Sequence, residues 1–288
     1  FLEIRDEKGS ARAYNSRGLA RLYANMELEQ ARKDFIEAKF IAEKTHDLAL
    51  LAKIFHNLAQ THQHLQELPE ALKAYLRARN LKDSLVAIGY PGISAREQVS
   101  TYNNLSVFYQ SVFQFDKARQ TSEKALELTP EEELGRRAVI LLTLGIIEHE
   151  DSNYNAALGH LDESLQLAQQ GGFTAYQPNI YNAIGNAHLE LKSVEAASDN
   201  YELALEILKD INLPDVKAGV VVDQADMFLR QNRYLEAKSK ATEALEIIQG
   251  NDNIGPEKLL QAHEVLAKVA EAQDDFPAAA YHLRKYAD

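Results

Sequence analysis

The chain has 288 residues, of which 45% are hydrophobic and 26% are charged, a composition typical of a folded globular protein and not of a disordered one. It contains no cysteine, which excludes disulfides, thiolate nucleophiles and cysteine-based zinc sites. Lysine and arginine total 31 against 43 acidic residues, and the resulting net charge of −12 argues against binding to nucleic-acid phosphates.

No membrane-spanning segment is expected. The longest apolar run, residues 138–147, is interrupted by Thr143 and Gly145 and is too short to cross a bilayer. No signal-peptide pattern follows Phe1. We therefore expect a soluble, cytoplasmic protein. Because the sequence starts on phenylalanine and not on methionine, we also expect it to be a piece of a longer protein.

One sequence register recurs seven times along the chain. The residue three positions before each reference alanine is always apolar, and the residues seven after and twelve before it are small in six of seven copies. Residues seven apart share one face of a helix, where small side chains let a neighbouring helix approach closely. The register therefore predicts repeated helical hairpins. The reference positions are Ala31, Ala71, Ala118, Ala157, Ala197, Ala237 and Ala279.

In chain order, the predicted hairpins occupy residues 11–45, 47–88, 95–129, 132–170, 174–210, 214–250 and 256–288, which together form a single repeat domain. Both halves of each hairpin carry apolar residues at three- and four-residue spacing, and a short turn joins them. The first copy is degenerate, with Leu19 at a normally small position. Between the second and third copies, Gly89–Gly92 interrupts the helical pattern. Strand patterns are nearly absent, so the fold class is predicted to be all-α.

The clearest copies combine Asn57-Leu58-Ala59 with Ala71, Tyr75 and Ala78, and Asn104-Leu105-Ser106 with Tyr109, Ala118 and Ala125. This pattern resembles the tetratricopeptide repeat (TPR), although the usual period of about 34 residues is stretched to about 40 and the family's tryptophan is missing. The long variant is similar to the repeats of kinesin light chain, of spindle-orienting scaffolds and of bacterial sensors and transcriptional regulators. The resemblance implies a right-handed superhelical solenoid in which the first helix of each hairpin lines a concave groove.

The sequence contains no recognisable catalytic or metal-binding motif. Phosphate-binding glycine loops, the nucleophile elbow and H-E-x-x-H are all absent, and His149-Glu150-Asp151 lacks the second histidine of a metalloprotease. His56, His62 and His64 point to different helical faces, which favours solvated or groove-lining histidines over a metal site. We therefore expect no enzyme activity, no cofactor and no metal.

Candidate binding residues are the positions of the first helices that face the predicted groove. They are rich in asparagine and glutamine, whose amides can pair with both the N–H and the C=O groups of an extended peptide. The alternative is that these amides only solvate a polar face or cap loops. The candidates are Lys53, His56, Asn57, Gln60, Gln63, Asn103, Asn104, Val107, Gln110, Leu142, Ile146, Asn179, Asn182, Asn186, Asp226 and Arg230.

The resemblance adds a role to three of these residues, and position in the predicted groove adds one to two more. Asn57, Asn104 and Asn182 correspond to asparagines that hold peptide backbones in related long-period arrays. In the middle of the groove, Leu142 and Ile146 would receive an apolar side chain of the ligand.

Two functions remain open from the sequence. The first is a non-catalytic scaffold that binds a neutral or basic peptide or partner segment in its groove. The alternative is the sensory region of a multidomain bacterial signalling protein or transcriptional regulator whose output domain lies elsewhere. The last helix carries Phe276, Ala280, Leu283 and Tyr286 on one stripe without a polar cap, which predicts self-association or docking of a following domain.

Overall fold

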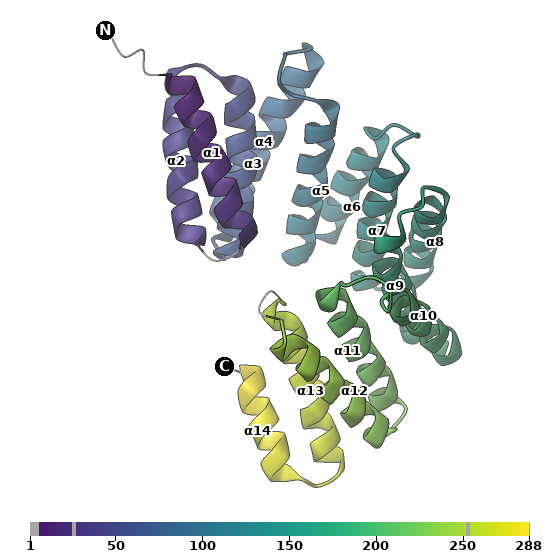
Figure 1. Cartoon of the computed structure of the whole chain (residues 1–288). Coiled ribbons are helices and arrows are strands. Elements are labelled where there is room, and N and C mark those ends of the chain that lie inside the picture. The colour runs from purple at the N-terminus through teal and green to yellow at the C-terminus, as the bar shows by residue number, and fades with distance from the viewer. Residues whose placement is uncertain (1–5, 25–26, 252–253, 288) are drawn as a thin grey trace. The chain divides into compact units, whose positions relative to one another are not determined.

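The computed structural model describes residues 6–24, 27–251 and 254–287, and the side chains of residues 286 and 287 lie outside that description (Figure 1). Over the described residues the secondary structure is helical and contains no strand, which confirms the all-α prediction. None of the helices in this part of the chain is both long enough and apolar enough to cross a membrane.

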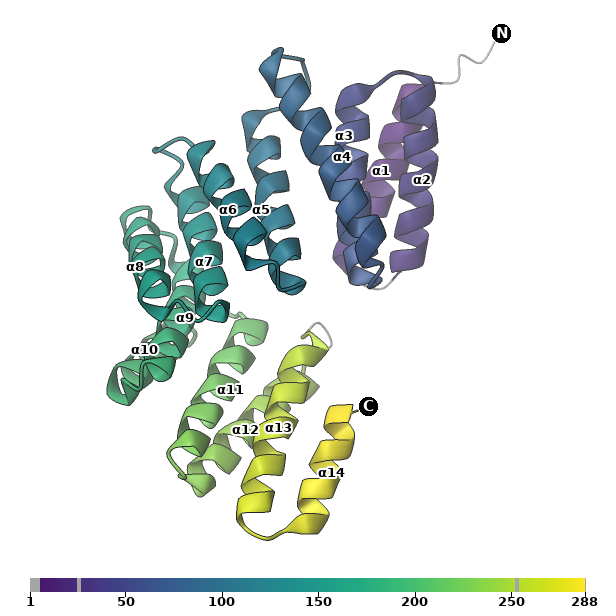
Figure 2. The ribbon, with the colours of Figure 1, turned by 180° about the vertical axis from the view of Figure 1, so that it is seen from behind.

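The chain forms two compact units, Phe1–Glu131 and Glu132–Asp288, called here the N-terminal and the C-terminal unit. In both, consecutive helices pair into hairpins, and each hairpin packs on the next one of the same unit (Figures 1 and 2). The helices of the N-terminal unit are α1 (Glu7–Ala24), α2 (Leu28–Lys44), α3 (Leu48–His64), α4 (Leu68–Ala87), α5 (Ala95–Ser111) and α6 (Phe115–Glu127).

The C-terminal unit has the same organisation, with one short 3₁₀ helix, η1 (Thr174–Tyr176), before its second hairpin. Its α-helices are α7 (Leu134–Glu150), α8 (Tyr154–Gln170), α9 (Gln177–Glu190), α10 (Val194–Ile207), α11 (Pro214–Arg230), α12 (Tyr234–Gln249), α13 (Pro256–Ala272) and α14 (Phe276–Ala287). The helix pairs follow the predicted repeats, so the prediction of a solenoid of TPR-like hairpins is confirmed.

The turn inside each hairpin after the first has one recurring geometry. In the α9–α10 turn, Lys192 has φ 61°. Its N–H donates to the carbonyl of Leu189 at 3.0 Å, and the N–H of Ser193 donates to the carbonyl of His188 at 2.9 Å. This pair of bonds is the Schellman motif, which satisfies helix-terminal carbonyls through one left-handed residue. Equivalent left-handed residues, none of them glycine, are Gln66, Phe113, Ser152, Asn232 and Asp274.

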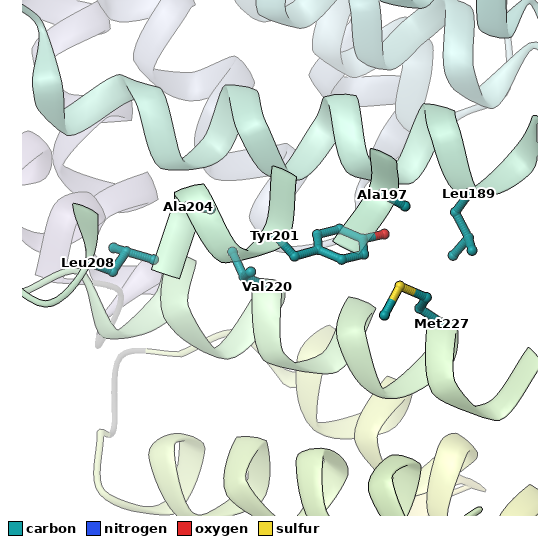
Figure 3. Packing of buried hydrophobic residues seen from close by; sticks show 7 residues of the cluster. All are labelled: Leu189, Ala197, Tyr201, Ala204, Leu208, Val220 and Met227. Atoms are coloured by element: carbon teal, nitrogen blue, oxygen red, sulfur yellow. The ribbon is translucent and has the colours of Figure 1, made fainter. Parts of the chain in front are cut away.

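The reference alanines are fully buried or nearly so, as the register requires, because they lie where helices approach closely. The core between α9, α10 and α11 shows how a small residue on one helix makes room for a large side chain of the next (Figure 3). The ring of Tyr201 is completely buried there beside Val220 and Met227. It lies against Gly185 on α9, where an added Cβ would come within 2.5 Å of the ring.

Gly89 and Gly92 interrupt the helical pattern as predicted. Both have positive φ, 62° and 95°, and they follow the end of α4. Ser94 then starts α5 with a capping box, in which its hydroxyl accepts from the Glu97 N–H and the Glu97 carboxylate accepts from the Ser94 N–H.

The structure describes three of the four side chains of the predicted apolar stripe on the last helix. Phe276 is 66% exposed and Leu283 is 44% exposed, so both side chains are open to solvent in this chain. The side chain of Tyr286 lies outside the described residues, and docking on this helix stays a prediction.

Candidate functional site

In the N-terminal unit, several candidate residues are engaged between helices and do not point freely into solvent. Asn57 on α3 is 7% exposed, and its Nδ2 donates to Oδ1 of Asn15 on α1 at 3.0 Å. His56 is held by α5, with its Nδ1 3.0 Å from Oγ1 of Thr101 and its Nε2 3.2 Å from Nδ2 of Asn104. These side chains therefore join neighbouring first helices.

A buried lysine completes this network. Lys82 reaches from α4, is 3% exposed, and donates to Oγ1 of Thr101 at 2.7 Å and to the carbonyl of Glu97 at 3.1 Å. The Glu97 carboxylate pairs with Lys53 at 2.9 Å. Burial lowers the pKa of Lys82 to about 8 and that of His56 to about 3. The role of this network is to connect α3, α4 and α5, and the sequence reasoning did not include Lys82 in it.

The remaining candidates of the N-terminal unit line α3 and α5. Gln63 accepts a hydrogen bond from the Tyr75 hydroxyl at 2.9 Å, and Val107 is 38% exposed. Asn103 has a buried Oδ1 that finds no hydrogen-bond partner in the described structure. Gln60 and Gln110 are partly buried.

Three candidates of the C-terminal unit lie apart from its other site residues. Leu142 and Ile146 on α7 are partly buried, and Leu142 packs against the core formed by α7, α8 and α9. Asn179, at the start of α9, is exposed.

Asn182 and Asn186 converge on one carboxylate of the next hairpin. Both amides donate to Oδ2 of Asp223 on α11, from 2.7 Å and 3.0 Å. The Asn186 carbonyl oxygen accepts from the buried Tyr201 hydroxyl at 2.6 Å, which fixes the orientation of that amide. Burial raises the pKa of Asp223, and the two amide hydrogen bonds oppose that rise.

The other two candidates form an ion-pair network one turn further along. Arg230 donates from Nε to Asp226 at 2.7 Å and from Nη1 to Glu190 at 2.9 Å, so it links the ends of α9 and α11. Both carboxylates hold the guanidinium in one position, where it faces the same surface as Asn186.

A cavity of about 360 Å³ opens at this place in the C-terminal unit. Its walls come from the first helices α7, α9, α11 and α13, the helices that the resemblance assigned to the binding face. Its volume lies within the range of ligand-binding pockets. The cavity is lined by His149, Asn186, Leu189, Glu190, Val222, Asp223, Asp226, Arg230, Gln261, Glu264, Val265 and Lys268.

The sequence reasoning found Asn186, Asp226 and Arg230 of this cavity and omitted most of the others. Extending the same count to the last hairpin would have added Gln261, Glu264 and Lys268, which lie six before, three before and one after its small residue.

Asp223 was missed although the sequence held a signal for it. It lies two residues before the small Ala225, the same register position that Asn57 and Asn104 occupy in their hairpins. A count that followed this position through all repeats would have found it.

The cavity offers polar groups for binding. Within the described ranges, no three His, Asp or Glu side chains form a group that could hold a metal ion. The arrangement can donate and accept hydrogen bonds and can hold charge, because amides, carboxylates and two cations meet at its walls.

Solved structures with the same fold include the apo form of the quorum sensor NprR from B. thuringiensis, with a TM-score of 0.74 and 16% sequence identity over 96% of this chain and 74% of that one. A Rap protein complexed with Competence and Sporulation Factor matches with a TM-score of 0.66 and 15% identity, again over 96% and 74% of the two chains.

Among curated sequences, the human outer dynein arm-docking complex subunit 4 is 37% identical over 59 residues, which is 20% of this chain. The match spans 9% of that relative's length. The family model for the MalT-like TPR region matches residues 105–288, which is more than half of the sequence. With its paired helices and repeated register, the chain belongs to the MalT-like TPR region family.

Proposed function

We propose that this chain is a non-catalytic interaction scaffold that binds a peptide or an extended segment of a protein partner. The observation that carries the proposal is the cluster of Asn182, Asn186 and Asp223, in which both amides donate to Asp223 and in which Asn186 and Asp223 line an open cavity. Oδ1 of Asn182 is buried and has no hydrogen-bond partner in the described structure. An unsatisfied buried acceptor is costly, and a peptide N–H would satisfy it.

The likeness to known proteins supports an interaction role. The fold is shared with a quorum sensor and with a Rap protein that was solved in complex with a factor, and the matched human relative is a subunit of a docking complex. Family membership also favours binding over catalysis, since stacked hairpins present extended surfaces for partners.

A second candidate function is the sensory part of a larger signalling protein. The quorum sensor with the same fold favours it, because there the array belongs to a protein that responds to a signal. In that function the same surface would bind the signal, and the response would be carried out elsewhere.

The test starts with capture of partners from a lysate by the full chain, followed by mapping of the bound segment to a synthetic peptide. Calorimetry then compares Asn182→Ala with the parent. Loss of one amide contact of about 0.5–1.5 kcal/mol should weaken binding about two- to tenfold. Asn155→Ala, an exposed asparagine on α8, is the matched control and should bind like the parent. Equal affinity of all three proteins for the mapped peptide would contradict the proposal.

A further inference from the structure

The cavity of the C-terminal unit carries an unbalanced charge. Four carboxylates line it, from Glu190, Asp223, Asp226 and Glu264, against the cations of Arg230 and Lys268. Both cations are already used, since Arg230 pairs with Glu190 and Asp226, and Lys268 pairs with Glu264 at 2.6 Å. Asp223 is the carboxylate that is left without a counter-ion among the residues that the structure describes.

The environment of Asp223 is suited to receive a positive group. Both amide donors, from Asn182 and Asn186, go to Oδ2, whereas Oδ1 accepts no hydrogen bond from any described residue. Lys258 on α13 lowers the pKa of Asp223 through its charge, but its ion pair is with Asp215, at 2.7 Å. Asp223 is partly buried, and a carboxylate withdrawn from water without a paired cation is costly in free energy, so a cation that enters the cavity gains from neutralising it.

A second acceptor on another wall is also unused. His149 on α7 lines the cavity, and its Nε2 is buried without a hydrogen-bond partner among the described residues. Burial lowers the pKa of His149, and the charges of Glu190 and Glu150 and a hydrogen bond to the Asn186 backbone oppose that fall. In the tautomer protonated at Nδ1, Nε2 accepts a hydrogen bond. The cavity thus combines a free carboxylate oxygen with a free imidazole nitrogen.

The rest of the wall is apolar. Leu189, Val222 and Val265 line the cavity beside the polar groups. A long basic side chain is complementary to such a wall, because its methylene stem packs against apolar surface while its charged end binds polar groups.

We propose that this cavity binds the side chain of an arginine in a bound peptide, with Asp223 as its counter-ion. The inference rests on the proposed function and names the ligand chemistry of that site. Arginine fits better than lysine, because its planar guanidinium carries five N–H donors that can reach a carboxylate and a second acceptor together. An anionic ligand group is disfavoured, since the lining carries more carboxylates than cations.

The experiment uses the full chain with methyl-labelled valine and leucine and follows the NMR signals of Val222, Val265 and Leu189. The probe is the capped pentapeptide Ala-Ala-Arg-Ala-Ala, and the same peptide with neutral citrulline in place of arginine is its isosteric control. We expect saturable shifts of these methyl groups with the arginine peptide and at least tenfold weaker binding of the citrulline peptide. Agmatine, which carries a guanidinium and a primary ammonium but no peptide backbone, should bind more weakly than the arginine peptide.

Two variants test whether the carboxylate of Asp223 binds the arginine side chain. Asp223→Asn should weaken binding of the arginine peptide about tenfold and remove the preference over citrulline. Asp199→Asn, which changes an exposed carboxylate on α10, should bind like the parent. If Asp223→Asn does not fold, the comparison of arginine with citrulline in the parent chain still decides the result.

Equal binding of the arginine and citrulline peptides, or no saturable binding of either, would overturn the inference. Agmatine binding as tightly as the peptide would overturn the assignment to a peptide ligand. The two failures are distinguishable. A mapped partner peptide that binds independently of its basic residues refutes only the arginine site, whereas equal affinity of the parent, Asn182→Ala and Asn155→Ala for the mapped peptide contradicts the proposed function itself.

Discussion

Replacement of Gly185 by alanine tests the close helix contact that the repeat register predicts. The new Cβ would lie 2.5 Å from Cε1 and 2.8 Å from Cδ1 of the Tyr201 ring, both inside van der Waals contact. The ring cannot move away easily, because it is fully buried and its hydroxyl is bonded to Asn186 at 2.6 Å.

The expected magnitude is a balance of two effects. Alanine in place of glycine favours the helix by about 1 kcal/mol, whereas overpacking of a core costs about 1–3 kcal/mol. We expect Gly185→Ala to lower the free energy of unfolding by about 1 kcal/mol, and by about 2 kcal/mol at most. Gly159→Ala on α8 is the control, since its Cβ meets no atom within 4 Å and the variant should be stabilised by about 0.5–1 kcal/mol.

Urea titration of the full chain by circular dichroism measures both variants, and hydrogen exchange of the α9 and α10 amides localises the effect. Combining Gly185→Ala with Tyr201→Leu should reduce the penalty of the alanine, because the smaller side chain leaves room for it. If Gly185→Ala proves as stable as Gly159→Ala, the close contact at this position is refuted.

Three further predictions concern stability. The pKa of Lys82 is about 8 in the folded chain and about 10.5 when unfolded, so the folded state binds fewer protons between these values. Stability in urea melts should therefore rise by about 2 kcal/mol from pH 7.5 to pH 10, an increase that Lys82→Met should abolish. Lys192→Gly should raise the melting temperature by relieving the left-handed backbone, whereas Ser193→Gly, at φ −88°, should lower it; the reverse order would contradict the turn geometry. Burial lowers the pKa of both His263 and His282, whose Nδ1 atoms are 3.0 Å apart; the charge of His282 lowers that of His263 further, and the charge of Lys238 lowers that of His282. Their contribution to stability is therefore complete above pH 6.5 and lost on acidification, and hydrogen exchange of α14 should be faster at pH 5 than at pH 7.5 unless His282 is replaced by glutamine.

The hairpins could be predicted because close helix packing forces small side chains to recur at fixed spacing. The turns could be placed only by that spacing. Each left-handed turn residue is a non-glycine such as Gln66 or Asn232, so the usual glycine signal for a helix end is missing. In contrast, the irregular connection could be predicted from Gly89 and Gly92, because its backbone requires positive φ at both positions, which glycine adopts readily.

The site could be predicted in part. The register identified Asn186, Asp226 and Arg230, because it indicates which positions of each first helix face the predicted groove. It could not show that His56 is held between helices, because this depends on Lys82 reaching across from a second helix. Long-range hydrogen bonds of this kind depend on the angle between packed helices, which the spacing of residues does not encode.

The closest packing in each unit is between helices that are consecutive or next but one along the chain. Under mechanical tension such a unit behaves as elements connected in series, because the described helices make their main contacts with neighbours along the chain. The weakest interface gives way first, and each hairpin of about 40 residues that unravels releases about 130 Å of extended chain. A unit built in this way lengthens in discrete steps and, when the force is removed, can refold one hairpin at a time on the neighbour that remained intact.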